Sequence, residues 1–447
     1  MAERAAGSPG RSRRSWKDMG AERRTAAVTE GFGGTRPRLA VVSSVLPFPR
    51  TSGQAQRVHY TLQAARERFE VAYVTVAPKD QTDEVSRRLR EFCDESVVLP
   101  SLWPGQGREA PLRRLRGAAY VARTGLKPSN YVIGRVELSP ERLRGVLETR
   151  RFDCALFEYW HASESVRVFR DKGIPCVLDM HNILWRSYAR QLEALRMVPA
   201  WLRRWAVERY RRREEEAWRR FDRVIAINRE EERYAAETLQ PGRVFYAPMG
   251  VELRAWPYSW APAEPKRVAY YGGLGGAQNV RTALRCAQAI MPEIWKSQPA
   301  AELWLVGSNP PEELRRLAAD SRIKVTGFVE NVRELLRTMS VVLCPWSGRY
   351  GFRSRVVELL ALGVPAVATA DAVDGMELEP GQGIRVAEGD VGLARAALEL
   401  LDDARLARAT SAAGRRRVEE LFDFDHTYGR LMREITSWLR TAKEVAA

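Results

Sequence analysis

The sequence predicts an α/β protein with two doubly wound, mainly parallel sheets. From residue 38 onward, short runs rich in β-branched and aromatic residues alternate with amphipathic segments of helix length. These runs fall into two series, and the proline-dense stretch Pro248–Pro265 separates them. The 447 residues also exceed what one ordinary hydrophobic core holds, so we expect two domains.

The first series predicts the sheet of an N-terminal domain over residues 38–248. Its strand-like runs are RLAVVSSV, VAYVTVA, SVVLP, CALFEYW, PCVLDMHN and RVIAIN. Helical stretches such as Gln56–Arg68 and Pro140–Arg151 separate these runs, as the crossovers between parallel strands require. Residues 1–37 are rich in Arg, Gly, Ser and Ala without periodicity, and they predict a disordered basic extension.

The second series predicts the sheet of a C-terminal domain over residues 249–425. Its runs are RVAYYGG, ELWLVGS, IKVTGF, VVLCPW, PAVATA and GIRVA. The amphipathic segment Phe422–Leu439 follows both sheets and carries a tryptophan of its own. We expect residues 426–447 to form a helix that crosses back to the first domain.

The stretch Pro345–Thr369 carries the chemistry that the sequence indicates most clearly. A strand ends in a polar loop, a short apolar helix follows, and Arg353 and Arg355 stand where the loop enters that helix. A helix N-terminus with two arginines suits a phosphate, because both offer N–H donors and positive charge. Glu358, one turn on, can accept two hydroxyl groups of a ribose. Together these features predict a nucleoside-diphosphate site.

A simpler interpretation is a pair of exposed loop arginines and a solvent-facing glutamate. The helix VVELLALG is otherwise apolar, however, so it is expected to be buried. A lone carboxylate in a buried helix needs a partner, which favours the binding site.

Composition restricts the surroundings in which such a site would work. The sequence has no apolar run of about 20 residues and no apolar segment near Met1. Its five cysteines are spread along the chain, which argues against a zinc site or a disulfide framework. We expect a cytoplasmic protein.

The net charge of +16 points to anionic partners. Besides the N-terminal extension, the positive charge gathers in Pro111–Lys127 and Trp201–Phe221, where arginines are interleaved with apolar side chains. Such segments are either solvated helix faces or a surface that meets the inner face of an anionic membrane or an anionic acceptor. No nucleic-acid-binding motif accompanies the charge, so nucleic acid is not expected as a partner.

Several segments, in this order, resemble retaining glycosyltransferases of family 4. They are PFPRTSGQAQRVHYTL, VLDMHN, FDRVIAIN, APMGVE, YYGGLGGAQNV, LWLVGSNPP, VTGFVENV and the loop–helix at Pro345–Thr369. The chain is most similar to the branch whose donor loop reads Gly-Gly-x-Arg-x-Lys, and Arg355 stands at the lysine position. This resemblance implies the GT-B fold, in which two Rossmann-like domains face a cleft, the first binding the acceptor and the second the donor.

The resemblance also implies roles for single residues of the donor domain. Arg353 and Arg355 neutralise the donor diphosphate, and Glu358 holds the ribose hydroxyls. Tyr350 replaces a glutamate that contacts the transferred sugar in much of the family, and Phe328 lies in a loop that lines the base pocket. The remaining donor-site candidates are Gly273, Asn279, Arg281, Gly307, Ser308, Gly351 and Ser354.

In the first domain, Ser52 and Gly53 match a glycine loop that approaches the donor phosphates, and Arg57 is expected to add charge there. His181 matches a histidine beside the reacting sugar, and the residues expected to touch acceptor or donor next to it are Asn182 and Arg186. The alternative for His181 is a strand-end histidine with a structural hydrogen bond.

The expected function is a hexosyltransferase-like, retaining transfer of sugar from a UDP-, GDP- or dTDP-linked donor to a hydroxyl group. The acceptor would be a sugar, a lipid-linked molecule or a small molecule, as in the biosynthesis of cell-surface polysaccharides, glycolipids or natural products. No cofactor and no metal site are expected, because no paired carboxylates end a strand in the donor domain. The alternatives are a non-catalytic GT-B scaffold protein and a sugar-nucleotide epimerase on the same fold.

Overall fold

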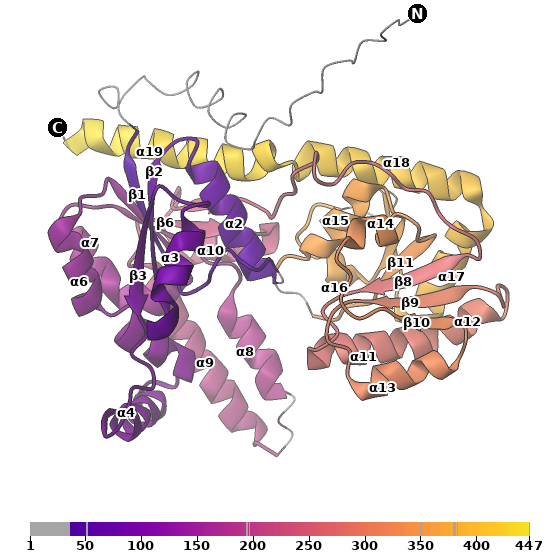
Figure 1. The fold of residues 1–447 in the computed structure, drawn as a ribbon, viewed down its shortest axis with the longest axis horizontal. Helices are drawn as coiled ribbons and strands as arrows, with labels where there is room; N and C mark the ends of the chain where they lie inside the picture. The colour runs from indigo at the N-terminus through magenta and orange to yellow at the C-terminus, as the bar shows by residue number, and fades with distance from the viewer. Residues whose placement is uncertain are drawn as a thin grey trace, which may run out of the picture.

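The computed structural model describes residues 36–50, 52–193, 195, 197–348, 351–378, 381 and 383–446. The predicted extension over residues 1–37 lies almost entirely outside this part of the chain, and so does Tyr350. Two α/β lobes follow one another along the chain, and the last helices run across both (Figure 1).

The first domain is built on a sheet in which every pairing is parallel. Its strands are β1 (Arg38–Val42), β2 (Glu70–Ala77), β3 (Glu95–Pro100), β4 (Cys154–Glu158), β5 (Cys176–Asp179), β6 (Arg223–Ala226) and β7 (Val244–Tyr246). Their order is β3-β2-β1-β4-β5-β6-β7. The strand order reverses at β1, where Leu39 pairs with Val71 on one side and with Cys154 on the other. Parallel sheets bind ligands beyond the carboxyl ends of strands at such a reversal.

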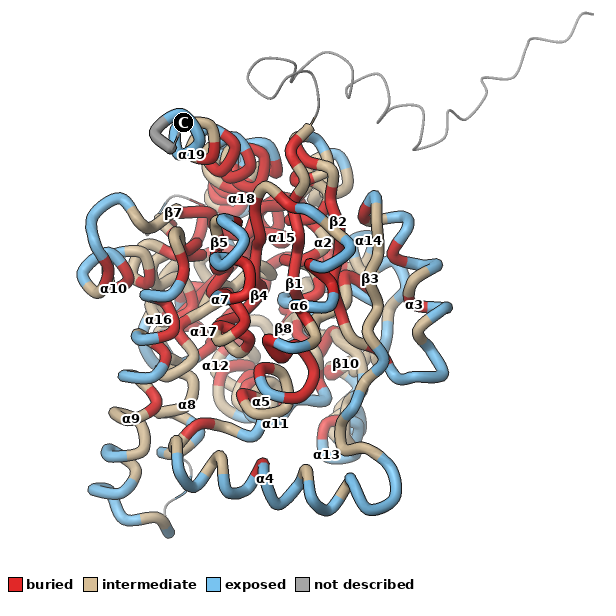
Figure 2. Tube along the Cα trace, turned by 90° about the vertical axis from the view of Figure 1, so that its left-hand side faces the viewer, coloured by how far each residue is buried: buried red, intermediate tan, exposed pale blue. Residues whose placement is uncertain are grey.

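Helices cover both faces of this sheet, which is why its strands are mainly apolar, with most charged residues at the strand ends. They are α2 (Gly53–Ala65), α3 (Thr82–Leu89), α4 (Glu109–Thr124), α5 (Pro128–Tyr131), α6 (Pro140–Thr149), α7 (Val166–Arg170), α8 (Leu184–Glu193), α9 (Ala200–Trp218) and α10 (Arg229–Thr238). Alternate residues of β1 point to opposite faces: Ala40 and Val42 belong to one apolar cluster, and Leu39 and Val41 to the other. Tyr120 of helix α4 packs against the first of these clusters, but the helix is exposed over most of its length (Figure 2).

The second domain repeats the arrangement with a smaller parallel sheet. Its strands are β8 (Arg267–Tyr271), β9 (Glu302–Val306), β10 (Ile323–Val325), β11 (Val341–Cys344), β12 (Ala366–Ala368) and β13 (Ile384–Val386), in the order β10-β9-β8-β11-β12-β13. Its helices are α11 (Ala277–Arg285), α12 (Met291–Trp295), α13 (Glu312–Arg315), α14 (Val332–Leu336), α15 (Ser354–Leu362), α16 (Ala370–Val373), α17 (Gly389–Asp402) and α18 (Ala404–Leu421). The strand order reverses at β8.

The chain crosses between the domains twice, and the two crossings lie side by side. The amide N–H of Val251 donates to the carbonyl of Phe422 (2.8 Å), and that of Phe424 donates to the carbonyl of Val251 (3.0 Å). Helix α19 (Arg430–Ala446) then runs over the first domain (Figure 1). Its residues Leu431 and Ile435 are buried in the same cluster as β1 and α2.

The predicted fold class is confirmed: two parallel, doubly wound sheets are present, and every run expected as a strand contains one. Strand β7 was not predicted, because it has only three residues and stands just before the proline-dense stretch Pro248–Pro265. None of the helices in the described part of the chain combines the length and the apolar composition that a membrane span requires.

Candidate active site

A pocket of about 290 Å³ lies between the two domains, and it contains the loop–helix singled out in the sequence. Residues predicted for the site line it from both sides: Ser52, Gly53, Asn279, Arg353, Ser354, Arg355 and Glu358. The first domain contributes the start of α2, and the second contributes the loop after β11 and the start of α15. The cleft between the two strand-order reversals, at β1 and at β8, therefore contains a polar site.

Two helix N-termini meet in this pocket. Helix α2 begins after Ser52, whose hydroxyl accepts the amide N–H of Ala55 (3.2 Å). At Gly53 a Cβ atom would have no neighbour within 4 Å, so the first turn is open to a ligand. Helix α15 begins at Ser354 from the opposite domain. Unpaired N–H groups and aligned peptide dipoles at both ends favour an anion between them.

The two predicted arginines stand at the start of α15, and each lies near the ring of an aromatic residue. The guanidinium carbon of Arg355 lies 5.4 Å from the ring centre of Tyr271, and that of Arg353 lies 5.8 Å from the ring centre of Trp346. Arg353 also donates to the carbonyl of Gly348 (3.3 Å). Both side chains line the pocket, where guanidinium groups can offer paired donors to phosphate oxygens.

Glu358 is almost completely buried inside α15, and its partner comes from the other domain. The side-chain amide of Gln56, on α2, donates to Glu358 Oε1 (2.9 Å). Burial raises the pKa of Glu358, while the Gln56 amide and the positive charge of Arg355 oppose this rise. The neighbours of Glu358 in α15 are apolar and buried, so the helix is held in place by packing while its one carboxylate faces the cleft.

The glycine loop after β8 lies beside the arginines, where a Cβ atom at Gly273 would be 3.8 Å from the Arg355 guanidinium. Asn279 lines the pocket and donates to the carbonyl of Gly273 (2.8 Å). Gly307 supports this loop from behind, since a Cβ atom there would lie 1.6 Å from the carbonyl oxygen of Gly272. Ser308 accepts the amide N–H of Leu274 through its backbone carbonyl (2.9 Å). These two predicted residues therefore shape the loop from outside the pocket.

His181 is held in a buried polar cluster at the end of β5. Its Nε2 is hydrogen-bonded to Glu158, and its ring stacks on Tyr159 with centroids 4.2 Å apart. Its φ of 57° is unusual for a residue with a side chain. The candidate ligand atoms of Glu158, Asp179 and His181 lie within 4.8 Å of one another. Such a spacing would admit a cation, but Arg57 supplies a positive charge there already.

Arg57 does not line the pocket, and its side chain is not directed toward the Ser52–Gly53 loop as expected. Its guanidinium is buried, pairs with Asp179 (2.8 Å) and donates to the carbonyl of Ala247 (2.8 Å). Residue 57 lies on the face of α2 that packs against the sheet, one turn after Gly53. A buried arginine needs a carboxylate, and the end of β5 provides one.

Other predicted residues lie around the pocket. The side chain of Asn182 lies next to Gly351: a Cβ atom added to this glycine would be 3.7 Å from the Cβ of Asn182. Arg186 lies over the rings of Trp185 and Tyr234, away from the pocket. Arg281 donates to Gln278 (2.6 Å). Phe328 is 75% exposed and does not line this pocket.

Gly351 joins the donor loop to the first domain. Its N–H donates to Glu231 (3.1 Å), and its carbonyl accepts the side-chain amide of Asn228 (2.8 Å). Glu231 also accepts the N–H of Ile183, two residues after His181 (3.1 Å). The loop that carries the arginines is therefore fastened to the loop that carries His181.

Sequence reasoning missed part of the pocket lining: Arg50, Gln56, Tyr271, Gln278, Trp346, Ser347 and Phe352. Arg50 and Gln56 flank the predicted Ser52–Gly53 loop, and Trp346 and Phe352 flank the predicted arginines. Their nearness in the sequence was a usable signal. The pairing of Gln56 with Glu358 spans 302 residues and had no local signal.

Models of two glycosyltransferase families match consecutive parts of the chain. The model described as glycosyl transferase 4-like domain matches residues 52–250, and the one described as glycosyl transferases group 1 matches residues 265–403. The first covers α2 and the His181 loop, and the second covers both arginines and Glu358. No curated protein sequence matches the chain significantly.

Solved structures of low sequence identity share the fold over almost the whole chain. Sucrose-phosphate synthase from Thermosynechococcus elongatus is 18% identical with a TM-score of 0.59, and covers 90% of this chain and 100% of its own. The Anabaena protein HepE in complex with UDP and glucose is 14% identical with a TM-score of 0.60 at the same coverage. A putative UDP-N-acetylglucosamine 2-epimerase from Listeria monocytogenes is 14% identical with a TM-score of 0.54, covering 90% and 96%. Since both halves match glycosyltransferase families and the architecture is that of these neighbours, the chain is a glycosyltransferase with the GT-B fold.

Proposed function

We propose that this enzyme transfers a sugar from a nucleoside-diphosphate sugar to an acceptor hydroxyl group, with retention of configuration and without a dedicated metal ion. One observation supports this function above the others. Two helix N-termini from opposite sides of the cleft, and two arginines at the start of α15, line a pocket in which Glu358 is the only carboxylate among the described lining residues. That pattern fits a diphosphate joined to a ribose.

The fixed positive charges of the pocket would act on the leaving group, which is the nucleoside diphosphate. As the bond between the sugar and the diphosphate breaks, negative charge grows on the phosphate oxygens. Arg353, Arg355 and the start of α15 stabilise that charge without having to reorganise, because aromatic contacts and backbone hydrogen bonds already hold them. These cations supply the charge stabilisation that Mg²⁺ supplies in other enzymes.

Glu358 is assigned to the ribose. A carboxylate accepts both hydroxyl groups of a diol, and the Gln56 amide orients its Oε1 from the first domain. Binding of the nucleoside therefore couples to the approach of the two domains.

His181 is assigned to the sugar end of the site. Its imidazole is buried at the carboxyl edge of the first sheet. The hydrogen bond between Nε2 and Glu158 fixes the orientation of the ring. Retention follows if the acceptor hydroxyl attacks from the face that the diphosphate leaves, with the departing phosphate oxygen taking the acceptor proton.

The acceptor is proposed to be anionic or lipid-linked, with the enzyme lying peripherally on an anionic membrane surface. The basic segments that motivate this proposal include α4 and α9 of the first domain. Leu112 and Leu115 of α4, and Trp201 and Trp205 of α9, are exposed among their arginines. Each basic residue near an anionic surface contributes about 1 kcal/mol. Flotation with anionic vesicles at low and high salt tests this part separately.

A non-catalytic scaffold and a sugar-nucleotide epimerase are the competing functions. Thermal-shift measurements against UDP-, GDP- and dTDP-sugars first identify the donor, and incubation of the purified enzyme with that donor follows. Slow release of free sugar and nucleoside diphosphate supports the transferase. Conversion to an isomeric sugar nucleotide supports the epimerase, and binding without turnover, even with acceptors present, supports the scaffold.

A further inference from the structure

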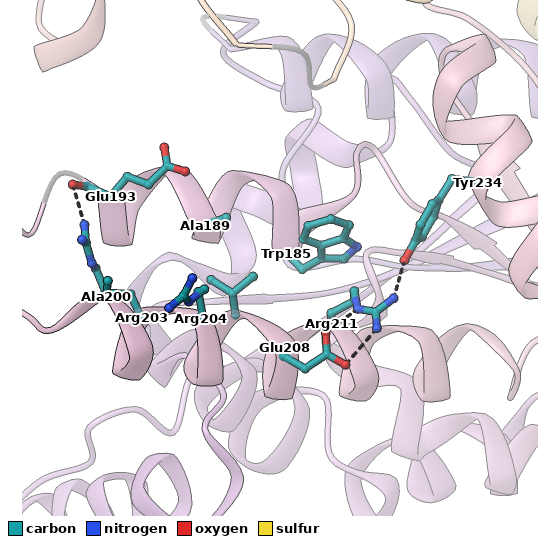
Figure 3. A pocket seen from close by; sticks show the side chains of 10 residues that line it. Trp185, Ala189, Glu193, Ala200, Arg203, Arg204, Glu208, Arg211 and Tyr234 are labelled. Carbon is teal, nitrogen blue, oxygen red and sulfur yellow. Dashed lines mark hydrogen bonds and ion pairs between the residues drawn. The ribbon is translucent and has the colours of Figure 1, made fainter.

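A second cavity, the α8–α9 groove, lies in the first domain outside the donor pocket. It has a volume of about 640 Å³ between α8, α9 and Tyr234 of α10, within the range of roughly 300–1,000 Å³ typical of small-molecule sites. Figure 3 shows Trp185 and Ala189 of α8 facing α9 across this groove. None of the functions assigned so far uses it.

Apolar side chains form part of the groove wall and are incompletely covered, and they stand among the charged residues Glu193, Arg203, Arg204, Glu208 and Arg211. Trp185, Ala189 and Val207 line it, and none of the three is buried. No residue of α8 is fully buried, even though α8 carries an apolar stripe that includes Leu184, Trp185 and Ala189. Apolar surface that stays half covered in the folded protein suits an apolar ligand.

Arginines stand at both ends of the groove. Arg211 lies at the Tyr234 end, where it pairs with Glu208 (2.8 Å). Arg203 and Arg204 lie toward the end where the helices are joined (Figure 3). The side chain of Arg204 makes no hydrogen bond or ion pair with the described part of the chain. Beyond it, Trp201 and Met197 are 67% and 97% exposed.

The groove starts beside the proposed reaction centre. Helix α8 begins three residues after His181, and Glu214 holds its first turn by accepting the N–H groups of Leu184 (2.8 Å) and Trp185 (2.7 Å). On its other side, α8 contacts the donor loop, where a Cβ atom at Gly348 would lie 2.6 Å from the Arg190 guanidinium. An elongated molecule lying in the groove would have one end near the cleft.

We propose that the α8–α9 groove holds the hydrocarbon chain of an acceptor lipid that carries a phosphate group. The apolar part of the wall matches the chain, the arginines match the anionic group, and the exposed aromatic tip of α9 matches the bilayer from which such a lipid comes. This inference rests on the proposed sugar transfer for its biological meaning, but the binding itself can be measured without turnover.

Equilibrium dialysis of radiolabelled dodecyl phosphate, below its micellar concentration, against the full-length enzyme tests the groove. The wild-type enzyme is expected to bind it, and inorganic phosphate is expected to compete far less well than unlabelled dodecyl phosphate. Ala189→Trp fills the groove without removing an existing side-chain contact and should weaken binding at least tenfold. Ala200→Trp, at the exposed start of α9, fills the same groove and provides a second variant should the first fold poorly.

Ala236→Trp is the matched control, because residue 236 is exposed on α10 outside the groove. It should bind dodecyl phosphate as the wild type does. Loss of wild-type binding, equal competition by inorganic phosphate, or wild-type affinity in both groove-filling variants would overturn the inference. Affinity for nucleoside diphosphate, measured on the same preparations, separates the two questions: if it is absent while the groove results hold, the proposed donor chemistry fails and the lipid site stands.

Discussion

Arg353 and Arg355 differ from the arginines on the outer surface of this chain in where they lie, because both line the pocket between the two domains. Each guanidinium lies against an aromatic ring at the wall of an inter-domain pocket. A positive charge over a ring keeps its N–H edges available for hydrogen bonds in the plane of the guanidinium. Glu358 is equally distinctive, because it is a buried carboxylate in a helix that is otherwise apolar.

Replacing either arginine by alanine should weaken nucleoside-diphosphate binding by about 2 kcal/mol, which is a roughly 30-fold rise in Kd. The reason is the loss of a charge-assisted hydrogen bond to a phosphate oxygen in a partly desolvated site. Isothermal titration with the preferred nucleotide measures the effect. Arg408→Ala, on an exposed part of α18, is the control. Wild-type affinity in both Arg353→Ala and Arg355→Ala would show that the diphosphate lies elsewhere.

Glu358→Gln should weaken ribose recognition, because an amide accepts through one oxygen only and its N–H₂ group would face the Gln56 donor. The affinity for a nucleotide with both ribose hydroxyls should fall by about tenfold, on the order of 1.4 kcal/mol. A 2′,3′-dideoxy analogue should bind the variant and the wild type alike. Glu313→Gln, exposed on α13, serves as the comparison. If both nucleotides lose affinity equally, Glu358 acts on the fold of the pocket and not on the ribose.

Two buried carboxyl groups hold the start of helix α8 in place. Its first turn and the preceding residue Ile183 donate backbone N–H groups to Glu214 and Glu231. Burial raises the pKa of Glu231 to about 7 and that of Glu214 to about 8. These carboxylates connect α8 to α9 and α10, and Glu231 also reaches Gly351 in the other domain.

The raised pKa of Glu231 predicts a stability that falls as the pH rises. The usual pKa of 4.5 applies in the unfolded chain, so between about pH 4.5 and pH 7 the folded protein keeps a proton that the unfolded chain has lost. The free energy of unfolding should therefore decrease through this window, and Glu231→Gln should reduce the slope. Urea unfolding at pH 5, 6, 7 and 8 measures it.

Glu237→Gln provides the control for this experiment, because residue 237 lies on the same helix and is exposed. It should keep the wild-type slope. An unchanged slope in Glu231→Gln would mean that Glu231 is ionised in the folded protein throughout this pH range, with its two backbone donors outweighing the effect of burial.

In the whole molecule, the strand-order reversals at β1 and β8 face each other across one cleft. Neither domain holds the donor pocket alone, since Gln56 comes from the first and Glu358 from the second. The crossing at Val251 and the packing of α19 against the first domain keep the two halves of the chain associated. The positive groups that line the cleft are side chains and helix ends of both domains.

Turnover of the sugar nucleotide should persist in EDTA. The positive charge that lines the pocket belongs to Arg50, Arg353, Arg355 and two helix N-termini, which a chelator does not remove. Initial rates with EDTA, and again after adding excess Mg²⁺ or Mn²⁺, measure this. A rate that disappears with EDTA and returns with either ion would show that a metal carries the leaving-group charge.

Much of the fold and part of the site could be predicted from the chain itself. Strand runs such as VAYVTVA and VVLCPW are local patterns, and burial on both faces of a parallel sheet makes them apolar. The arginines and Glu358 stand within six residues of one another on one loop–helix, so their shared pocket was visible in the sequence. Ser52 and Gly53 were visible for the same reason, as the start of a helix.

Tertiary structure alone decided the contacts that join distant segments. Whether residue 57 faces the pocket or the sheet depends on the rotation of α2, and Asp179 at the end of β5 determined that Arg57 points inward. The partner of Glu358 lies 302 residues away, and the groove between α8 and α9 exists only because the two helices pack beside each other. The local periodicity of the sequence indicates which residues are buried. Which side chains they contact depends on how whole helices and strands pack together.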